Sequence, residues 1–329
     1  MTSKDLVKRA IEFRNPDRLP FEFEVYGLSD TVDFGWNQIG TGDNTKRETL
    51  DEWGCMWRRS DVKNMGQVKG HPLDNWDKLA DYKFPDPDDP VFWEGLEEKS
   101  KKLDREKYIK TGIFMLLFER LHSLHGFENV MLDFYIEREK LETLADRIVE
   151  FDIGIINNTA RRFPGLIDGI CFSDDWGTEQ AAFISIELFN EFFKPRYKKI
   201  FNACHNAGWH VWLHSCGKIT TLVPSLIDAG VDVFNLQQPR VFGLEEFGKL
   251  FAGKTCFSAC ADIQHTLPFK SIPEVEEEVK LLLEYWATPQ GGYIVSDDGN
   301  ADDIGVSDAV KRSMFDAYIK HDPYKKNHA

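Results

Sequence analysis

The feature that most constrains the fold of this chain is a regular alternation of short apolar runs and amphipathic helical segments after residue 107. Each apolar run is of the length expected for a strand, and the segment that follows it has helical periodicity. The runs lie at 108–114, 167–177, 210–217, 231–238, 254–260 and 291–299. Near-continuous apolar runs are typical of parallel strands buried on both faces, which are joined by crossover helices.

Two more strands are predicted nearer the N-terminus, at 21–27, where FEFEVYG alternates between two faces, and near 55–61. An open doubly wound sheet is the alternative architecture, but no G-x-G-x-x-G or G-x-x-x-x-G-K-[ST] motif follows any strand. No repeat, low-complexity tract or linker divides the chain. We therefore expect an α/β fold, a single (β/α)8 TIM barrel over residues 1–329, with the irregular stretch 28–107 inserted over the barrel mouth.

The charge composition of the chain indicates which classes of binding partner are unfavourable. The formal net charge is −15 and the sequence pI is about 5.1, which argues against nucleic acid or an anionic membrane as a ligand. No run of eighteen apolar residues is present, and the N-terminal MTSKDLVKRAIEF has the pattern of an amphipathic helix. The 6 cysteines are scattered, so we expect reduced thiols in a cytoplasmic protein.

Polar side chains follow five of the predicted strands, at the ends where a (β/α)8 barrel carries its chemistry. They are Asp174, Asp175, Trp176, His214, Ser215, Cys216, Gln237, Gln238, Cys260, Asp262, Asp297 and Asp298. Loops are polar in any protein, which explains part of this pattern. It explains a cysteine poorly, because free cysteine is usually buried among apolar neighbours.

The segment VWLHSCG contains the most specific of these pairs. Residues i and i+2 of a strand point to the same side, so His214 and Cys216 project together, and both are zinc donors. A buried cysteine beside a hydrogen-bonded histidine is the alternative interpretation. Likewise, Asp174 and Asp175 are either site residues or helix caps, and the Asp297–Asp298 pair is either a ligand pair or an ordinary turn.

The segments DDWGTEQAAFISIELFNEFFKPRYKKIF and WLHSCGKITTLVPSLIDAGVDVFNLQQP resemble the uroporphyrinogen decarboxylase superfamily, as do RAIEFRNPDRLPF and ACADIQHTLPFKS. The resemblance covers nearly the whole chain and implies a (β/α)8 barrel. His-x-Cys-Gly is similar to the zinc-dependent, corrinoid-linked methyltransferase branch, which implies that His214 and Cys216 ligate zinc. The third ligand of that branch is a cysteine after the last strand, and Asp298 stands at this position; Cys260 is the reserve ligand.

The decarboxylase itself is the alternative within the superfamily. It carries an arginine-rich segment after its first strand, whereas residues 21–40 here contain two Glu, two Asp and no Arg. A substrate with several carboxylates requires bidentate arginine partners, so the sequence disfavours a porphyrinogen. The third hypothesis is that the chain is a non-catalytic relative of these enzymes that binds a small molecule.

The resemblance therefore implies methyl transfer between a small methylated substrate and a corrinoid (cobalamin) carried by a partner protein, with zinc as Lewis acid. Asp174 or Asp175 is expected to orient the substrate or donate a proton, and Trp176, Gln237 and Asp297 are expected to contact it. A methoxylated aromatic is one expected substrate, because aromatic residues make up 13% of the chain, and a methylated ammonium held by the acidic residues is the competing one. For the assembly, a homodimer is one expectation.

Overall fold

A seven-stranded parallel sheet lies at the centre of the computed structural model, which describes residues 1–23, 27–36, 42–43, 45–60, 66–297 and 304–325. In spatial order, the sheet contains β12 (Tyr293–Val295), β11 (Cys256–Ala259), β10 (Val233–Leu236), β9 (His210–His214), β8 (Gly169–Ser173), β7 (Tyr108–Ile113) and β3 (Thr31–Asp33). Every neighbouring pair in this sheet is parallel. The sheet curls around its own axis, as a barrel requires.

The eighth strand comes from the hairpin of β1 (Glu22–Phe23) and β2 (Leu28–Ser29). Phe21, which leads into β1, forms a parallel bridge with Val295 of β12. On the other side, the backbone N–H of Asp30 donates to the carbonyl of Phe21 at 2.7 Å, and Asp30 accepts from Tyr108 N at 2.9 Å. The predicted (β/α)8 barrel is confirmed, with β1 between β12 and β3.

The predicted strand near 55–61 is wrong as a barrel strand. β5 (Met56–Arg58) pairs antiparallel with β4 (Glu48–Leu50) and β6 (Gln67–Gly70) in a separate sheet. Its central residue is buried and the next one is exposed, which is the pattern of a strand with only one covered face. The missing barrel strand is β3, whose three residues are too few to show a period.

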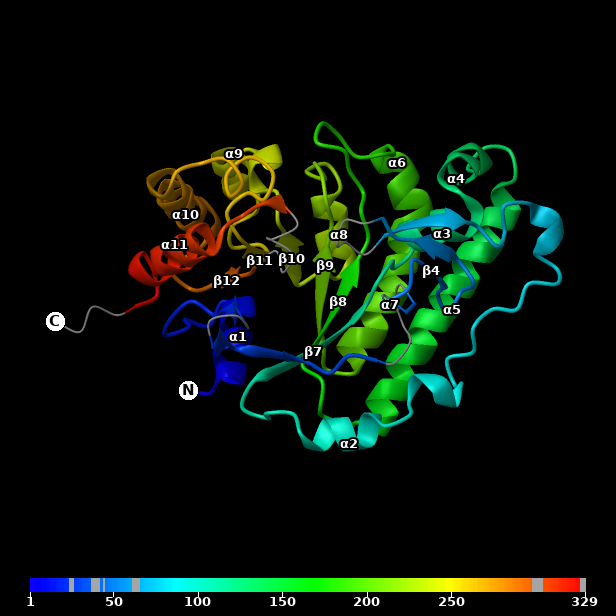
Figure 1. Ribbon diagram of the computed structural model, residues 1–329, viewed down its shortest axis with the longest axis horizontal. Helices are drawn as coiled ribbons and strands as arrows, with labels where there is room; N and C mark the ends of the chain where they lie inside the picture. Colours follow the sequence, from blue (N-terminus) through cyan, green and yellow to red (C-terminus); the bar gives the residue numbers. More distant parts are fainter. Residues whose placement is uncertain (24–26, 37–41, 44, 61–65, 298–303, 326–329) are drawn as a thin grey trace.

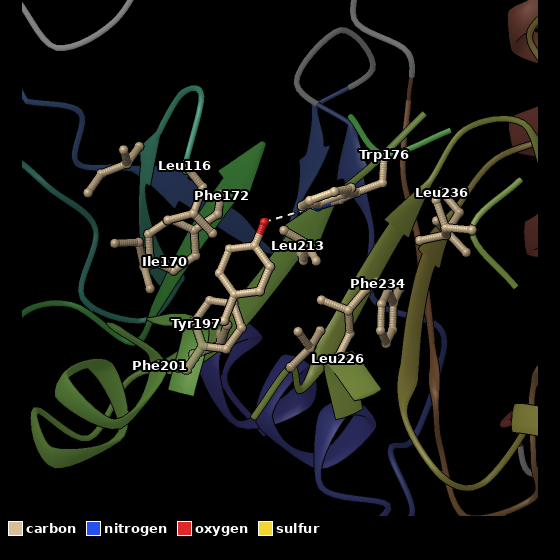
Figure 2. Packing of buried hydrophobic residues seen from close by; sticks show 14 of the residues in the cluster. Leu116, Ile170, Phe172, Trp176, Tyr197, Phe201, Leu213, Leu226, Phe234 and Leu236 are labelled. Carbon is tan, nitrogen blue, oxygen red and sulfur yellow. Dashed lines mark hydrogen bonds between the residues drawn. The ribbon is translucent and has the colours of Figure 1, made fainter. Parts of the chain in front are cut away.

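Helices cover the outside of the barrel (Figure 1). In chain order they are α3 (Phe118–His125), α4 (Phe127–Asp133), α5 (Arg138–Arg162), α6 (Ile186–Leu188), α7 (Lys194–Asn206), α8 (Val223–Ala229), α9 (Leu244–Phe251), α10 (Ile272–Trp286) and α11 (Asp308–Lys320). The outward residues of β8, β9 and β10 pack against α7 and α8 (Figure 2). None of the helices in the described ranges is long and apolar enough to cross a membrane.

Inward-facing side chains alternate with these packed positions, and they change from apolar to polar along the barrel axis. At the N-terminal ends of the strands, helix α1 (Ser3–Ile11) closes the barrel. Three of its side chains form one buried cluster with inward residues of the strands; the cluster is Val7, Ala10, Ile11, Tyr108, Trp212, Val233, Cys256 and Ile294. The polar inward residues therefore gather at the opposite, C-terminal end.

The three-stranded sheet β4–β5–β6 lies beside α3 at that end (Figure 1). Arg120 of α3 is 1% exposed and forms a 2.7 Å ion pair with Asp51, which also accepts from the indole N–H of Trp57 at 3.1 Å. The following segment runs along α5, where the Asn158 amide donates to the Pro87 carbonyl at 2.9 Å, and ends in α2 (Leu96–Lys101). Among the described residues of the predicted lid, the three-stranded sheet is therefore the part that lies at the mouth.

Candidate metal centre

Three possible metal ligands meet at the C-terminal ends of β8 and β9. Ser173 of β8 is in register with His214 of β9, so Asp175 and Cys216, each two residues further on, also lie side by side. One donor atom from each of Asp175, His214 and Cys216 lies within 4.8 Å of the others. The Cys216 sulfur is 3.4 Å from His214 Nε2, which is 3.8 Å from Asp175 Oδ1.

The loops that carry these residues are held in place by backbone contacts. The N–H of Cys216 donates to Asp175 Oδ1 at 2.8 Å, and the N–H of Gly217 donates to the Gln238 side-chain oxygen at 2.8 Å. Gly217 has φ 77°, and a Cβ there would lie 2.2 Å from the carbonyl oxygen of Gly177. Only glycine allows the two loops to approach this closely.

The chemistry of the three donors fits zinc. Imidazole nitrogen, thiolate and carboxylate are all zinc ligands, and catalytic zinc sites combine three protein ligands with one open position. His214 Nδ1 lies 2.8 Å from the side-chain oxygen of Asn235, so Nδ1 carries the proton and the Nε2 lone pair faces the other two donors. Asp175 is 38% exposed, which leaves this side of the centre accessible.

A cavity of about 490 Å³ adjoins the centre at Asp175. Its lining residues come from the three-stranded sheet, from the end of β7, and from α3 and α4; they are Trp57, Gly66, Gln67, Val68, His71, Phe114, Met115, Glu119, His122, Ser123, Phe127 and Asp175. The rings of Trp57 and Phe114 have centroids 6.0 Å apart. This volume and these aromatic walls fit a small, flat ligand.

Two titratable groups in the cavity wall are pushed toward their neutral forms. Burial, followed by the charges of Asp175 and Asp174, raises the pKa of Glu119 well above its ordinary value. Its carboxyl oxygen accepts from Ser173 Oγ at 3.1 Å. Burial lowers the pKa of His122 to about 4, with a further contribution from His71. Both shifts favour the uncharged forms of these side chains, a protonated carboxyl for Glu119 and a neutral imidazole for His122.

Asp174 and Trp176 are buried beneath the site and support it, and neither side chain lines this cavity. Asp174 is 0% exposed and accepts from the backbone N–H groups of Leu117, Phe118 and Glu119 at 3.1, 2.9 and 2.7 Å. It therefore caps the start of α3 and fixes Glu119. Burial, which outweighs these hydrogen bonds, raises the pKa of Asp174 to about 6. The predicted proton-donating role does not suit a carboxylate enclosed in this way.

The indole of Trp176 is also fully buried, so the predicted contact with substrate does not suit it either. Its ring stacks on Phe118 with centroids 4.3 Å apart, and its N–H donates to the hydroxyl of Tyr197 at 3.0 Å (Figure 2). The Tyr197 hydroxyl in turn donates to Asp174. Tyr197 thus connects the two buried groups that support α3.

We expect Tyr197→Phe to lower the free energy of unfolding by about 1–3 kcal/mol, because it leaves a buried acceptor and a buried indole N–H without their shared partner. The phenylalanine ring keeps the stacking with Phe201, whose centroid is 5.4 Å away. Urea unfolding of the variant and of the unmodified protein measures the difference. Equal midpoints and slopes would show that this hydroxyl does not support the site.

Among the described residues, the other predicted site residues are not part of the donor cluster. Cys260 is buried in the hydrophobic core and is not part of the donor cluster found among the described residues. Asp298 lies outside the described residues. Gln237 is half-buried, and its backbone carbonyl accepts from Ile263 N at 3.2 Å. Asp297 is 9% exposed and lies 3.7 Å from the Lys311 ammonium.

Sequence reasoning missed three residues of the site, namely Glu119, His122 and Asn235. Glu119 follows the end of β7 in the first turn of α3, so the rule that barrel chemistry lies after the strands also applies to it. Its signal was hidden because the apolar stretch MLLF separates it from the strand. His122 is one turn further along the same helix.

Comparisons with known proteins agree with the barrel. The family model described as Uroporphyrinogen decarboxylase (URO-D) matches residues 71–297. A solved methyltransferase from Methanosarcina mazei superposes with a TM-score of 0.72 at 15% identity, covering 97% of this chain and 99% of that one. At this identity the likeness shows the fold. An N-acetyl-D-glucosamine-6-phosphate deacetylase from Mycobacterium smegmatis superposes with a TM-score of 0.26 at 11% identity, covering 60% of this chain and 51% of that one. This similarity is too low to support any conclusion about the fold. Comparison with curated proteins gave no match.

Proposed function

This chain belongs to the uroporphyrinogen decarboxylase family, and within that family we propose that it is a zinc-dependent methyltransferase, moving a methyl group between a small methylated compound and a corrinoid protein. The observation that carries the proposal is the cluster of Asp175, His214 and Cys216, which adjoins an aromatic cavity at Asp175. The fold shared with the Methanosarcina mazei methyltransferase is consistent with it.

His214 Nε2, Cys216 Sγ and an Asp175 carboxylate oxygen would hold the zinc. When bound, zinc would supply Lewis acidity to the substrate atom from which the methyl group departs. Asp175 thereby replaces Asp298 as the proposed third ligand, because register places it beside Cys216. Its proposed role changes from proton donor to metal ligand.

The cavity favours a neutral methoxylated aromatic as the substrate. Trp57, Phe114 and Phe127 provide flat apolar surfaces for a ring. The raised pKa of Glu119 and the lowered pKa of His122 both favour the uncharged forms of these side chains. A methylated ammonium would gain less here, since the raised pKa of Glu119 reduces the negative charge that would face it.

Glu119 is the proposed proton donor. An alkoxide or phenolate is a poor leaving group, and protonation of its oxygen as the carbon–oxygen bond breaks lowers the barrier. Glu119 lines the same cavity as Asp175, so a substrate bound there can reach both side chains. In this scheme the methyl carbon passes to the cobalt of the partner, and the oxygen keeps the electron pair and takes the proton from Glu119.

Decarboxylation of a porphyrinogen is disfavoured by the charge of the cavity. Among the described residues that line it, none is an arginine or a lysine. A substrate with several carboxylates would bury negative charge near Asp175 without a cationic partner, and each such contact costs on the order of a few kcal/mol.

Both reactions can be tested on one preparation. We expect about one zinc per chain, methylation of cob(I)alamin by a methoxyarene, and loss of that activity after chelation. We expect no turnover of uroporphyrinogen. Zinc content is measured by elemental analysis and cobalt methylation by its absorption change. Porphyrinogen turnover without cobalt methylation would reject the proposal.

A further inference from the structure

We propose that Asn235 is a positioning residue for the metal centre, and that a polar chain across the barrel interior fixes its amide for this task. The chain runs from Lys110 through Glu22, Ser258 and Asn235 to His214. The inference rests on the proposed function, since it assumes that His214 ligates a metal. It adds residues of β1, β7, β10 and β11 to a centre whose ligands follow β8 and β9.

Strand register brings the last three members of this chain together. Asn235 of β10 is paired with His214 of β9 on one side and with Ser258 of β11 on the other. All three are inward-facing positions, so their side chains form one layer across neighbouring strands. His214 Nδ1 lies 2.8 Å from Asn235 Oδ1, and Asn235 Nδ2 donates to Ser258 Oγ at 3.1 Å.

The orientation of the Asn235 amide decides which nitrogen of His214 can bind a metal. With Oδ1 toward the imidazole, His214 must donate from Nδ1, and its Nε2 lone pair is left for the metal. The reversed amide would donate to Nδ1 and would place the imidazole proton on Nε2, where it would block ligation. The other side of the amide lies 3.4 Å from the backbone carbonyl of Ser258, which can only accept, so an N–H is required on that side and the reversed amide is excluded.

Ser258 can accept from Asn235 because its own proton is committed elsewhere. Its hydroxyl donates to Glu22 Oε2 at 3.3 Å, and the Lys110 ammonium lies 2.6 Å from Glu22 Oε1. Ser258 is fully buried, and the side chains of Glu22 and Lys110 are 10% and 22% exposed. The ion pair therefore keeps Glu22 available as an acceptor, and each hydrogen bond of the chain has one direction.

An amide in this position also leaves the charge of the centre balanced. One carboxylate and one thiolate, from Asp175 and Cys216, supply two negative charges to a divalent cation. A carboxylate in place of Asn235 would give the same tautomer of His214 but would add a third negative charge. Asn235→Asp therefore keeps the tautomer of His214 while it changes the charge, so it serves as the control for the effect of the tautomer.

The experiment measures zinc affinity by competition with a chromophoric chelator, together with the absorption spectrum of the cobalt(II)-substituted protein. We expect Asn235→Leu to weaken zinc binding by about 10- to 100-fold, while Asn235→Asp stays within about threefold of the unmodified protein. The cobalt(II)–thiolate band should persist in Asn235→Asp and weaken in Asn235→Leu. Asn158→Leu, which removes a buried amide on α5, is the matched control and should bind zinc normally.

Ser258→Ala keeps the test decisive if Asn235→Leu does not fold. It removes the group that orients the amide, and we expect zinc affinity to fall by about 3- to 10-fold. Unchanged affinity in Asn235→Leu, or in Ser258→Ala where the leucine variant is unfolded, would overturn the inference. An unmodified protein that binds no zinc would instead reject the metal centre of the proposed function, and would overturn this inference with it.

Discussion

Replacing Cys216 by serine is expected to abolish zinc binding and the methyl transfer that depends on it, while the fold stays intact. Serine has the same shape but a hydroxyl group, which does not ionise near neutral pH and is a poor zinc ligand. Of the donor cluster found among the described residues, His214 and Asp175 would remain, and two donors are too few for a stable site. Elemental analysis and the cob(I)alamin assay measure both losses.

Cys204→Ser is the matched control for this variant. Cys204 lies on α7, is fully buried, and its thiol donates to the Ile200 carbonyl at 3.3 Å, a contact that a hydroxyl can also make. We expect this variant to keep its zinc and its activity. Full zinc occupancy in Cys216→Ser would reject Cys216 as a ligand, and equal losses in both variants would point to unfolding.

The barrel was predictable because burial on both faces determines the composition of its strands. The runs around β7 to β12 are mainly apolar, and each is followed by a helical period. The barrel strands were predicted wrongly where this apolar pattern is absent or belongs to another sheet. β3 has three residues, and β5 shows a strand-like alternation but belongs to another sheet. Sequence periodicity identifies strands without identifying their partners.

Period-two alternation also accounts for the predicted and the missed parts of the metal centre. It places His214 and Cys216 on one side of a strand, as expected. Applied to β8, it places Ser173 and Asp175 inward and Asp174 outward beneath α3, as the structure shows. Asp175 could therefore have been separated from Asp174. The choice of Asp298 followed from the resemblance alone.

Asn235 required a further step that sequence does not supply. Its inward orientation follows from alternation with Phe234 and Leu236, both of which are buried outward. Its contact with His214 depends on the exact register between β9 and β10. A shift of one residue would have placed an apolar side chain there instead. Register is set by the packing of the whole barrel.

The second large effect is expected for Glu119→Gln, which should lower kcat for a methoxyarene by about 10²- to 10⁴-fold. Glutamine has nearly the shape of a protonated glutamic acid but cannot transfer a proton to the departing oxygen. The zinc ligands are unchanged, so zinc content should not change. Glu128→Gln, at an exposed position of α4, is the matched control and should retain full activity.

The pH profile distinguishes a proton donor from a residue that only shapes the cavity. Burial and the neighbouring carboxylates raise the pKa of Glu119, so the unmodified enzyme should be fully active below that pKa and lose activity as pH rises through it. Glu119→Gln should lack this alkaline decline. The defect should also shrink for methoxyarenes with electron-withdrawing substituents, whose phenolates leave without prior protonation. An equal defect for all donors, with the decline retained, would exclude Glu119 as the acid.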